Sequence, residues 1–162
     1  MKVSEAKRFM RMAIRKAAAG IKKGQTPFGA CIVKDGRDGK VVSCEHNVVW
    51  KTTDITAHAE VHAIRSACRR LRTIDLSGCV IYTTCEPCTM CMSACHWARI
   101  GKIVFGASIA DAQKAGFNEL VISARTMKRL GRSPVKIVGG FLRREARALF
   151  ALWSASKDRR VY

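Results

Sequence analysis

The sequence predicts a three-layer α/β/α sandwich whose middle layer is a mixed sheet of five strands. Two features lead to this prediction. Two apolar runs flank a glycine-containing turn, as in an antiparallel hairpin, and from residue 56 onward helical periodicity alternates with further short apolar runs. The chain has 162 residues, of which 48% are hydrophobic, enough to bury the core of one domain. Residues 1–162 are therefore expected to form a single domain.

The first predicted elements are a helix and a hairpin. Ser4 and Glu5 are typical of a helix start, and Gly20 is typical of its end. Gly36 and Gly39 lie in the segment expected to reverse the chain. The hairpin strands are expected over residues 28–34 and 41–44, on either side of the turn at 35–39.

The rest of the chain predicts alternating helices and strands. Pro87 lies at a position where the first turn of a helix tolerates proline. Successive strands joined by helices run parallel, and these helices bury their apolar stripes on the faces of the sheet. The expected helices are 56–70, 88–98, 119–130 and 141–153, the expected strands are 79–83, 103–106 and 135–138, and a basic tail follows at 154–162.

Charge and cysteine content bear on partners and location. Thirty Lys and Arg against twelve Asp and Glu give a net charge of +18, which makes nucleic acid a possible partner. The basic residues are spread along the chain, a pattern that favours solvated helix faces. No apolar run approaches the roughly 18 residues of a membrane span, so no membrane partner is expected. The N-terminus lacks a signal-peptide pattern, so the eight cysteines are expected as thiols in a cytoplasmic protein.

Two short motifs predict a zinc site. His58 lies in a His-Ala-Glu motif, and Cys88 and Cys91 lie in a Pro-Cys-x-x-Cys motif. Cysteines three apart lie on one face of a helix, where two thiolates can hold one ion, and a neutral histidine can supply a third ligand. Three protein ligands leave a fourth position open for water, as a catalytic zinc site requires.

Glu60 is the candidate proton shuttle of this site. It lies two residues after His58, near the start of the same predicted helix, so its carboxylate can reach a water at the metal without binding zinc. A lone Cys-x-x-Cys pair would equally indicate a redox pair or half of a structural zinc site. The two motifs together resemble the signature of the zinc deaminases, and this resemblance implies hydrolytic deamination of a base. The other six cysteines are assigned no chemistry, although Cys85 lies near the motif.

Longer stretches resemble the cytidine deaminase-like superfamily of zinc deaminases, and bacterial guanine deaminases most of all. The resemblance covers nearly the whole chain. It departs at Ile55 and Thr89, where proline is common, at the longer turn 35–40, and in the basic region 121–134. The matching residues are 27–30, Asn47, 53–61, 85–91, 97–99, 115–119 and Tyr162.

The resemblance implies a cytidine deaminase-like fold, one Zn²⁺ per subunit and conversion of guanine and water to xanthine and ammonia. It further implies a homodimer in which the tail 154–162 closes an active site by exchange between two subunits. The implied residues are His58, Cys88 and Cys91 for zinc, Glu60 and Glu119 for proton transfer, and Phe28, Asn47, Ala59, Trp97 and Tyr162 for the purine.

Other substrates and roles stay open. Residues 99–107 are similar to tRNA adenosine deaminases, whose tRNA substrate would account for the positive charge. Another amino-heterocycle or nucleoside, such as guanosine or cytosine, would suit the same zinc motifs. A non-catalytic relative with structural zinc is a further possibility, but such a site has no use for a proton shuttle at Glu60.

Overall fold

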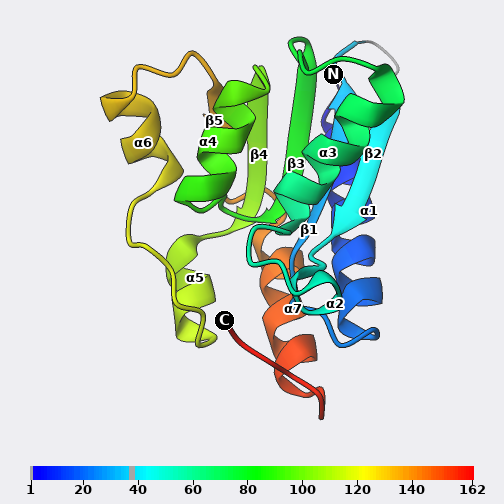
Figure 1. Ribbon diagram of the computed structural model, residues 1–162, viewed down its shortest axis with the longest axis vertical. Helices are drawn as coiled ribbons and strands as arrows, with labels where there is room; N and C mark the ends of the chain where they lie inside the picture. Colours follow the sequence, from blue (N-terminus) through cyan, green and yellow to red (C-terminus); the bar gives the residue numbers. More distant parts are fainter. Residues whose placement is uncertain (1, 37–38) are drawn as a thin grey trace.

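The computed structural model describes residues 2–36 and 39–162, and its centre is a mixed five-stranded sheet in the order β2-β1-β3-β4-β5 (Figure 1). β1 pairs antiparallel with both β2 and β3, whereas β3 pairs parallel with β4 and β4 with β5. The predicted hairpin and mixed sheet are confirmed, and the predicted turn at 35–39 lies partly outside the described residues. The strands are β1 (Gly29–Lys34), β2 (Val41–His46), β3 (Cys79–Cys85), β4 (Lys102–Ala107) and β5 (Lys136–Val138).

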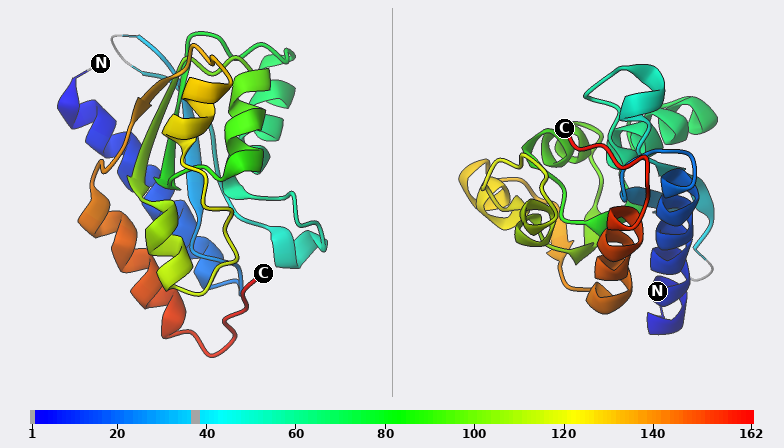
Figure 2. Two further views of the ribbon diagram at one scale, coloured as in Figure 1. Left: turned by 90° about the vertical axis from the view of Figure 1, so that its left-hand side faces the viewer. Right: turned by 90° about the horizontal axis from the view of Figure 1, so that it is seen from below.

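Helices cover both faces of the sheet, which confirms the three layers (Figure 2). Alternate strand residues point to opposite faces, so Cys31 and Tyr82 pack under α1 while Ile32 and Ile81 belong to the core under α3 and α4. α7 lies close to β4 because Gly106 has no side chain where Ala146 approaches. These helices are α1 (Val3–Ile21), α3 (Ala59–Leu71), α4 (Thr89–Trp97) and α7 (Arg143–Ser154).

Three shorter helices differ from the sequence prediction. α2 (Val49–Thr52) and α5 (Ile109–Lys114) were not predicted, because four and six residues are too few to show helical periodicity. The predicted helix 119–130 begins only at α6 (Ala124–Leu130), where the Ser123 hydroxyl accepts from the Thr126 N–H and caps the helix. Glu119 therefore lies in an irregular segment rather than on a helix.

The start of α3 is also later than predicted. The Asp54 carboxylate accepts hydrogen bonds from both the backbone N–H and the hydroxyl of Thr56, which keeps this stretch in a turn. The helix begins at Ala59, with His58 in extended conformation before it. Among the described residues, no helix is long and apolar enough to cross a membrane.

Candidate zinc and active site

Two of the predicted zinc ligands occupy equivalent places in the fold. His58 is the residue before α3 and Cys88 is the residue before α4, and both are extended, with ψ of 157° and 174°. Cys91 lies in the first turn of α4 and is buried. The Glu86 N–H donates to the Ala107 carbonyl, so the loop entering α4 is held at the carboxyl end of β4. The two helix starts meet at this edge of the sheet.

The three ligand atoms have the spacing that one zinc ion requires. His58 Nδ1 lies 3.7 Å from Cys88 Sγ and 3.6 Å from Cys91 Sγ, and all three atoms lie within 4.8 Å of one another. Zinc bonds of about 2.0–2.3 Å at tetrahedral angles would separate sulfur from nitrogen by about 3.5 Å. One nitrogen and two sulfurs are also a donor set that zinc prefers. The three residues therefore fit three corners of a tetrahedral site, and within the described part of the chain no further histidine, cysteine or carboxylate joins the group.

The thiol groups are arranged for metal binding. A hydrogen bond from the Cys91 thiol lowers the pKa of Cys88 to about 4, and His58 adds to this effect against the opposing effect of burial. Thiolates are the metal-binding form of cysteine, and metal binding displaces the remaining proton. Cys85 and Cys95 are buried nearby, and burial raises the pKa of both thiols. They suit the role of small apolar side chains.

Glu60 lies beside these ligands in the first turn of α3. Its side chain is buried, its Oε1 accepts a hydrogen bond of 2.9 Å from the Thr83 hydroxyl, and its Oε2 lies 3.5 Å from Cys91 Sγ. Burial raises the pKa of Glu60, and the negative charge of Cys88 raises it further. The carboxyl group is thus next to the three ligands without being one of them.

Glu119 lies close to Glu60 and Cys88 in the structure, although it is distant from them in the sequence. It lines a small hollow with Phe28, Glu60 and Cys88. Burial raises the pKa of Glu119 to about 7, with a further contribution from the negative charge of Cys88. Two carboxyl groups with raised pKa values therefore face one candidate metal site.

A cavity of about 320 Å³ opens beside the zinc ligands. This volume lies at the lower end of the range for small-molecule sites, about 300–1,000 Å³. Apolar side chains provide most of its walls. The lining residues are Ile55, His58, Cys88, Thr89, Met90, Phe117, Asn118, Glu119, Leu120 and Tyr162.

The predicted substrate residues Phe28, Asn47 and Ala59 do not line this cavity, but each lies next to a residue that does, namely Phe117, Tyr162 and His58 respectively. Phe28 is buried, and its ring lies 4.8 Å from the ring of Phe117 in an edge-on arrangement. Asn47 is fully buried, and its Oδ1 accepts from the Val49 N–H at 3.1 Å. Ala59 is the buried first residue of α3, directly after His58.

The tail brings Tyr162 back to the site of its own chain. The Tyr162 ring lies 5.3 Å from the His58 ring and 5.8 Å from the Phe117 ring, and its hydroxyl accepts from Asn47 Nδ2 at 2.8 Å. Two residues before Tyr162, the Arg160 guanidinium lies 5.5 Å from the centre of the Trp50 ring. A single chain is therefore enough to place Tyr162 at the site, and exchange of tails between subunits stays a prediction.

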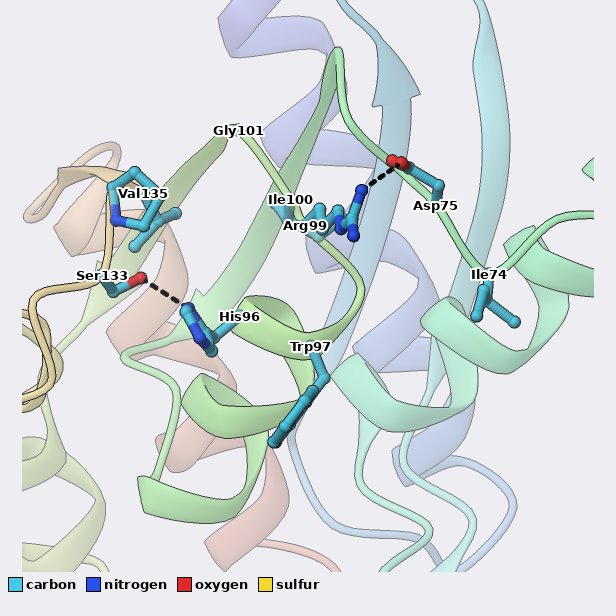
Figure 3. Close-up of a pocket in the computed structure, with 10 residues that line it drawn as sticks. Ile74, Asp75, His96, Trp97, Arg99, Ile100, Gly101, Ser133 and Val135 are labelled. Atoms are coloured by element: carbon cyan, nitrogen blue, oxygen red, sulfur yellow. Dashed lines mark hydrogen bonds and ion pairs between the residues drawn. The ribbon is translucent and has the colours of Figure 1, made fainter.

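Trp97 does not lie at this site, and the predicted aromatic pocket needs correction. Trp97 is the last residue of α4, and nine helical residues place it about 13 Å along the helix from Cys88. Its side chain is 82% exposed and lines a separate groove of about 690 Å³, together with Ile74, His96 and Arg99 (Figure 3). Phe117 supplies the aromatic wall that Trp97 was predicted to form.

Sequence reasoning missed three residues near the site. Phe117 is two positions before Glu119 in the stretch 115–119, for which the resemblance implies a role only at Glu119. Glu86 lies within the Cys-Glu-Pro-Cys stretch, and its glutamate had no evident partner in sequence. Thr83 ends an apolar run, so nothing in the sequence distinguishes its hydroxyl from that of an ordinary strand threonine.

The chain is similar to known zinc-binding deaminases. Residues 3–107 match the family model described as the cytidine and deoxycytidylate deaminase zinc-binding region. The guanine deaminase of Bacillus subtilis (strain 168) is 44% identical over 115 residues, which cover 70% of this chain and 72% of that protein. A tRNA-specific adenosine deaminase of Aquifex aeolicus (strain VF5) is 48% identical over 99 residues, 61% of this chain and 64% of that protein.

Two solved structures come from the same two groups of relatives. A guanine deaminase from Nitrosomonas europaea superposes with a TM-score of 0.84 at 27% identity, covering 91% of this chain and 84% of that one. A structure of tRNA:A34 deaminases, which perform A-to-I editing at the wobble position, superposes with a TM-score of 0.73 at 30% identity, covering 88% and 99%.

Proposed function

The chain belongs to the cytidine and deoxycytidylate deaminase family and is a zinc-dependent hydrolytic deaminase, and we propose that its substrate is guanine, which it converts with water to xanthine and ammonia. One observation carries this proposal. The C-terminal tail ends at a cavity of about 320 Å³, where Tyr162 forms part of the wall and its hydroxyl accepts a hydrogen bond from Asn47. A free base fits a cavity of this volume beside the tail more readily than a base attached to a polymer does. The similarity to two guanine deaminases supports the same substrate.

The two carboxyl groups divide the proton transfers. Zinc, when held by His58, Cys88 and Cys91, provides a nucleophilic water near neutral pH. Glu60 takes a proton from the attacking water and delivers it to a ring nitrogen of the purine. Glu119 then protonates the amino group, which leaves as ammonia when its bond to carbon breaks, and the carbonyl forms as the hydroxyl of the former water returns its proton to Glu119. A pKa of about 7 lets Glu119 both give and accept a proton at neutral pH.

The neighbouring side chains orient the base. Asn47 Oδ1 is held by the Val49 N–H, which fixes the amide so that its Nδ2 points toward the site. The amide nitrogen carries a second N–H, which a purine acceptor can use while the first N–H donates to Tyr162. The edge-on rings of Phe28 and Phe117 offer apolar surface to the flat base.

Parallel assays of ammonia release test the substrate. The zinc-loaded protein is incubated with guanine, guanosine, cytosine, adenine and bulk tRNA at low and high salt, with Glu60→Ala as the blank. We expect release from guanine at both salt concentrations. Glu60→Ala should keep its zinc and lose at least about 100-fold in kcat, because it lacks the proton acceptor. Full activity of Glu60→Ala would contradict the role of Glu60, and release from another substrate alone would contradict guanine.

A tRNA adenosine deaminase is the second candidate. The net charge of +18 and the similarity to two tRNA deaminases favour it. Binding through phosphate contacts weakens steeply as salt rises, because counterions are released from the nucleic acid. Release from tRNA alone, lost at high salt, would establish this candidate in place of guanine.

A further inference from the structure

Glu86 joins two parts of the active site that are far apart in sequence. It lies directly after β3 and two residues before the ligand Cys88. Its backbone N–H donates to the Ala107 carbonyl at 2.8 Å, so its main chain is fixed to the end of β4. Its side chain is half-buried and points away from this strand pairing toward α5 and α6.

The Glu86 carboxylate accepts hydrogen bonds from the first residues of both helices. Its Oε2 accepts from the Ile109 N–H at 3.3 Å, and its Oε1 accepts from the Ala124 N–H at 3.0 Å. The capping hydroxyls of Ser108 and Ser123 accept from other amides, each three residues further along. Glu86 therefore accepts hydrogen bonds from N–H groups that the two serines do not bind. A negative charge at a helix N-terminus is also favourable, because it interacts with the helix dipole.

The segment between these two contacts forms one wall of the cavity. Phe117, Asn118, Glu119 and Leu120 all line the cavity and all lie between Ile109 and Ala124. Part of this segment has little buried surface to fix its position, since Leu120 is 63% exposed and Val121 is 77% exposed. A carboxylate that contacts both ends of the segment can fix its position relative to Cys88.

We propose that Glu86 is a positioning residue that holds the segment containing Glu119 in register with the zinc ligands. The inference rests on the proposed role of Glu119 in proton transfer. Glu86 borders the small hollow that Glu60, Cys88 and Glu119 line, and it is not one of the three candidate zinc ligands. It acts through the two helix starts, and its loss would let Glu119 move relative to Glu60.

Three variants separate this role from ordinary helix capping. We expect Glu86→Ala to lower kcat by about 10- to 100-fold while zinc content is retained, as is typical when support for an active-site group is removed. Glu86→Gln keeps one acceptor oxygen and should lose less. Ser123→Ala is the matched control, because it removes a capping bond of α6 without detaching α6 from β3, and it should keep kcat within about twofold.

Two further measurements test the coupling to Glu119. In a Glu119→Gln background, Glu86→Ala should cause no additional loss of kcat, because the group it positions is already gone. Amide hydrogen exchange should quicken across residues 109–124 in Glu86→Ala, but only across 124–130 in Ser123→Ala.

Each outcome is distinct. Wild-type kcat in Glu86→Ala, additive losses in the double variant, or unchanged exchange across 109–124 would each overturn the inference while leaving the deaminase reaction intact. Wild-type kcat in Glu119→Gln would overturn the proposed role of Glu119 and the inference with it. Absence of ammonia release from every substrate would instead contradict the proposed function.

Discussion

At the scale of single residues, Thr83 decides how Glu60 faces the site. Its hydroxyl donates to Glu60 Oε1 at 2.9 Å inside the core, where the carboxyl group has few other polar partners. Thr83→Val keeps the shape of the side chain and removes this hydrogen bond. We expect kcat to fall by about tenfold with zinc content unchanged. Thr83→Ser, which keeps the hydroxyl, is the control, and equal kcat in both variants would contradict this role.

The raised pKa of Glu119 predicts a pH dependence. Burial holds the pKa of this carboxyl group near 7, so it stays protonated up to about neutral pH and ionises above it. A step that needs its proton should therefore slow as pH rises past about 7. The kcat profile measured from pH 5 to 9 should show this alkaline decline, and Glu119→Gln should abolish it. A decline that persists in Glu119→Gln would assign it to another group.

Some residue roles could be predicted from sequence and others could not. His58, Glu60, Cys88 and Cys91 were recognised because their spacing along the chain already reflects the chemistry of the site. The partners of Glu60 and of the helix starts come from distant segments, so Thr83 and Glu86 needed the fold. Trp97 was misplaced because a resemblance transfers a residue type, whereas α4 places that residue at the wrong end of the helix.

At the scale of elements, Asp111 connects α5 to α7. Its side chain is 5% exposed and contacts Arg143 at 3.0 Å and Arg147 at 3.3 Å. Asp111→Asn removes the charge from both contacts. We expect a loss of about 2 kcal/mol in unfolding free energy, measured by urea denaturation at pH 7. Glu145→Gln, which alters the exposed pair with Arg11, is the control and should lose much less.

The same carboxylate predicts a sensitivity to acid. Burial raises the pKa of Asp111, but the Ser108 amide and Arg143 outweigh burial, so the pKa lies below its usual value of 3.8. A lowered pKa in the folded state contributes stability above the unfolded value, and this contribution disappears as pH falls through the folded one. The difference in unfolding free energy between the wild type and Asp111→Asn should therefore become smaller below about pH 4, because the wild type loses this contribution there. If this difference in unfolding free energy did not change with pH, the charge of Asp111 would be excluded as the cause of the lost stability.

Element predictions succeeded where periodicity was long. The helix of nineteen residues and the fully buried β3 were evident from spacing and apolar runs. The helix expected from residue 119 was wrong at its start, because Ser123 caps it and the preceding residues form a cavity wall. This irregular segment is also where Glu119 lies, so local rules are least reliable at the site itself.

At the scale of the whole molecule, the tail is held on the body by a few contacts. Tyr162 bonds to Asn47, and Arg160 lies over Trp50. Deleting residues 157–162 removes both contacts and opens the cavity beside His58. We expect KM for guanine to rise at least about tenfold, since a well-placed aromatic contact with its hydrogen bond is lost. Steady-state kinetics of Tyr162→Phe and Arg160→Ala separate the hydroxyl from the cation, and an unchanged KM after deletion would rule out a lid.

The placement of His58 and Cys88 at the starts of two helices has a consequence for folding. About 30 residues, including all of α3 and β3, separate these ligands. An ion bound to both closes that stretch into a loop, as a cross-link does. Cys88 and Cys91 are neighbours in the sequence even in the unfolded chain, whereas His58 is brought to them by the packing of α3 against α4 in the folded structure. Zinc binding therefore stabilises the fully folded state more than partly folded states. A chelator present during refolding should lower the yield of folded protein far more than the same chelator added to the folded protein.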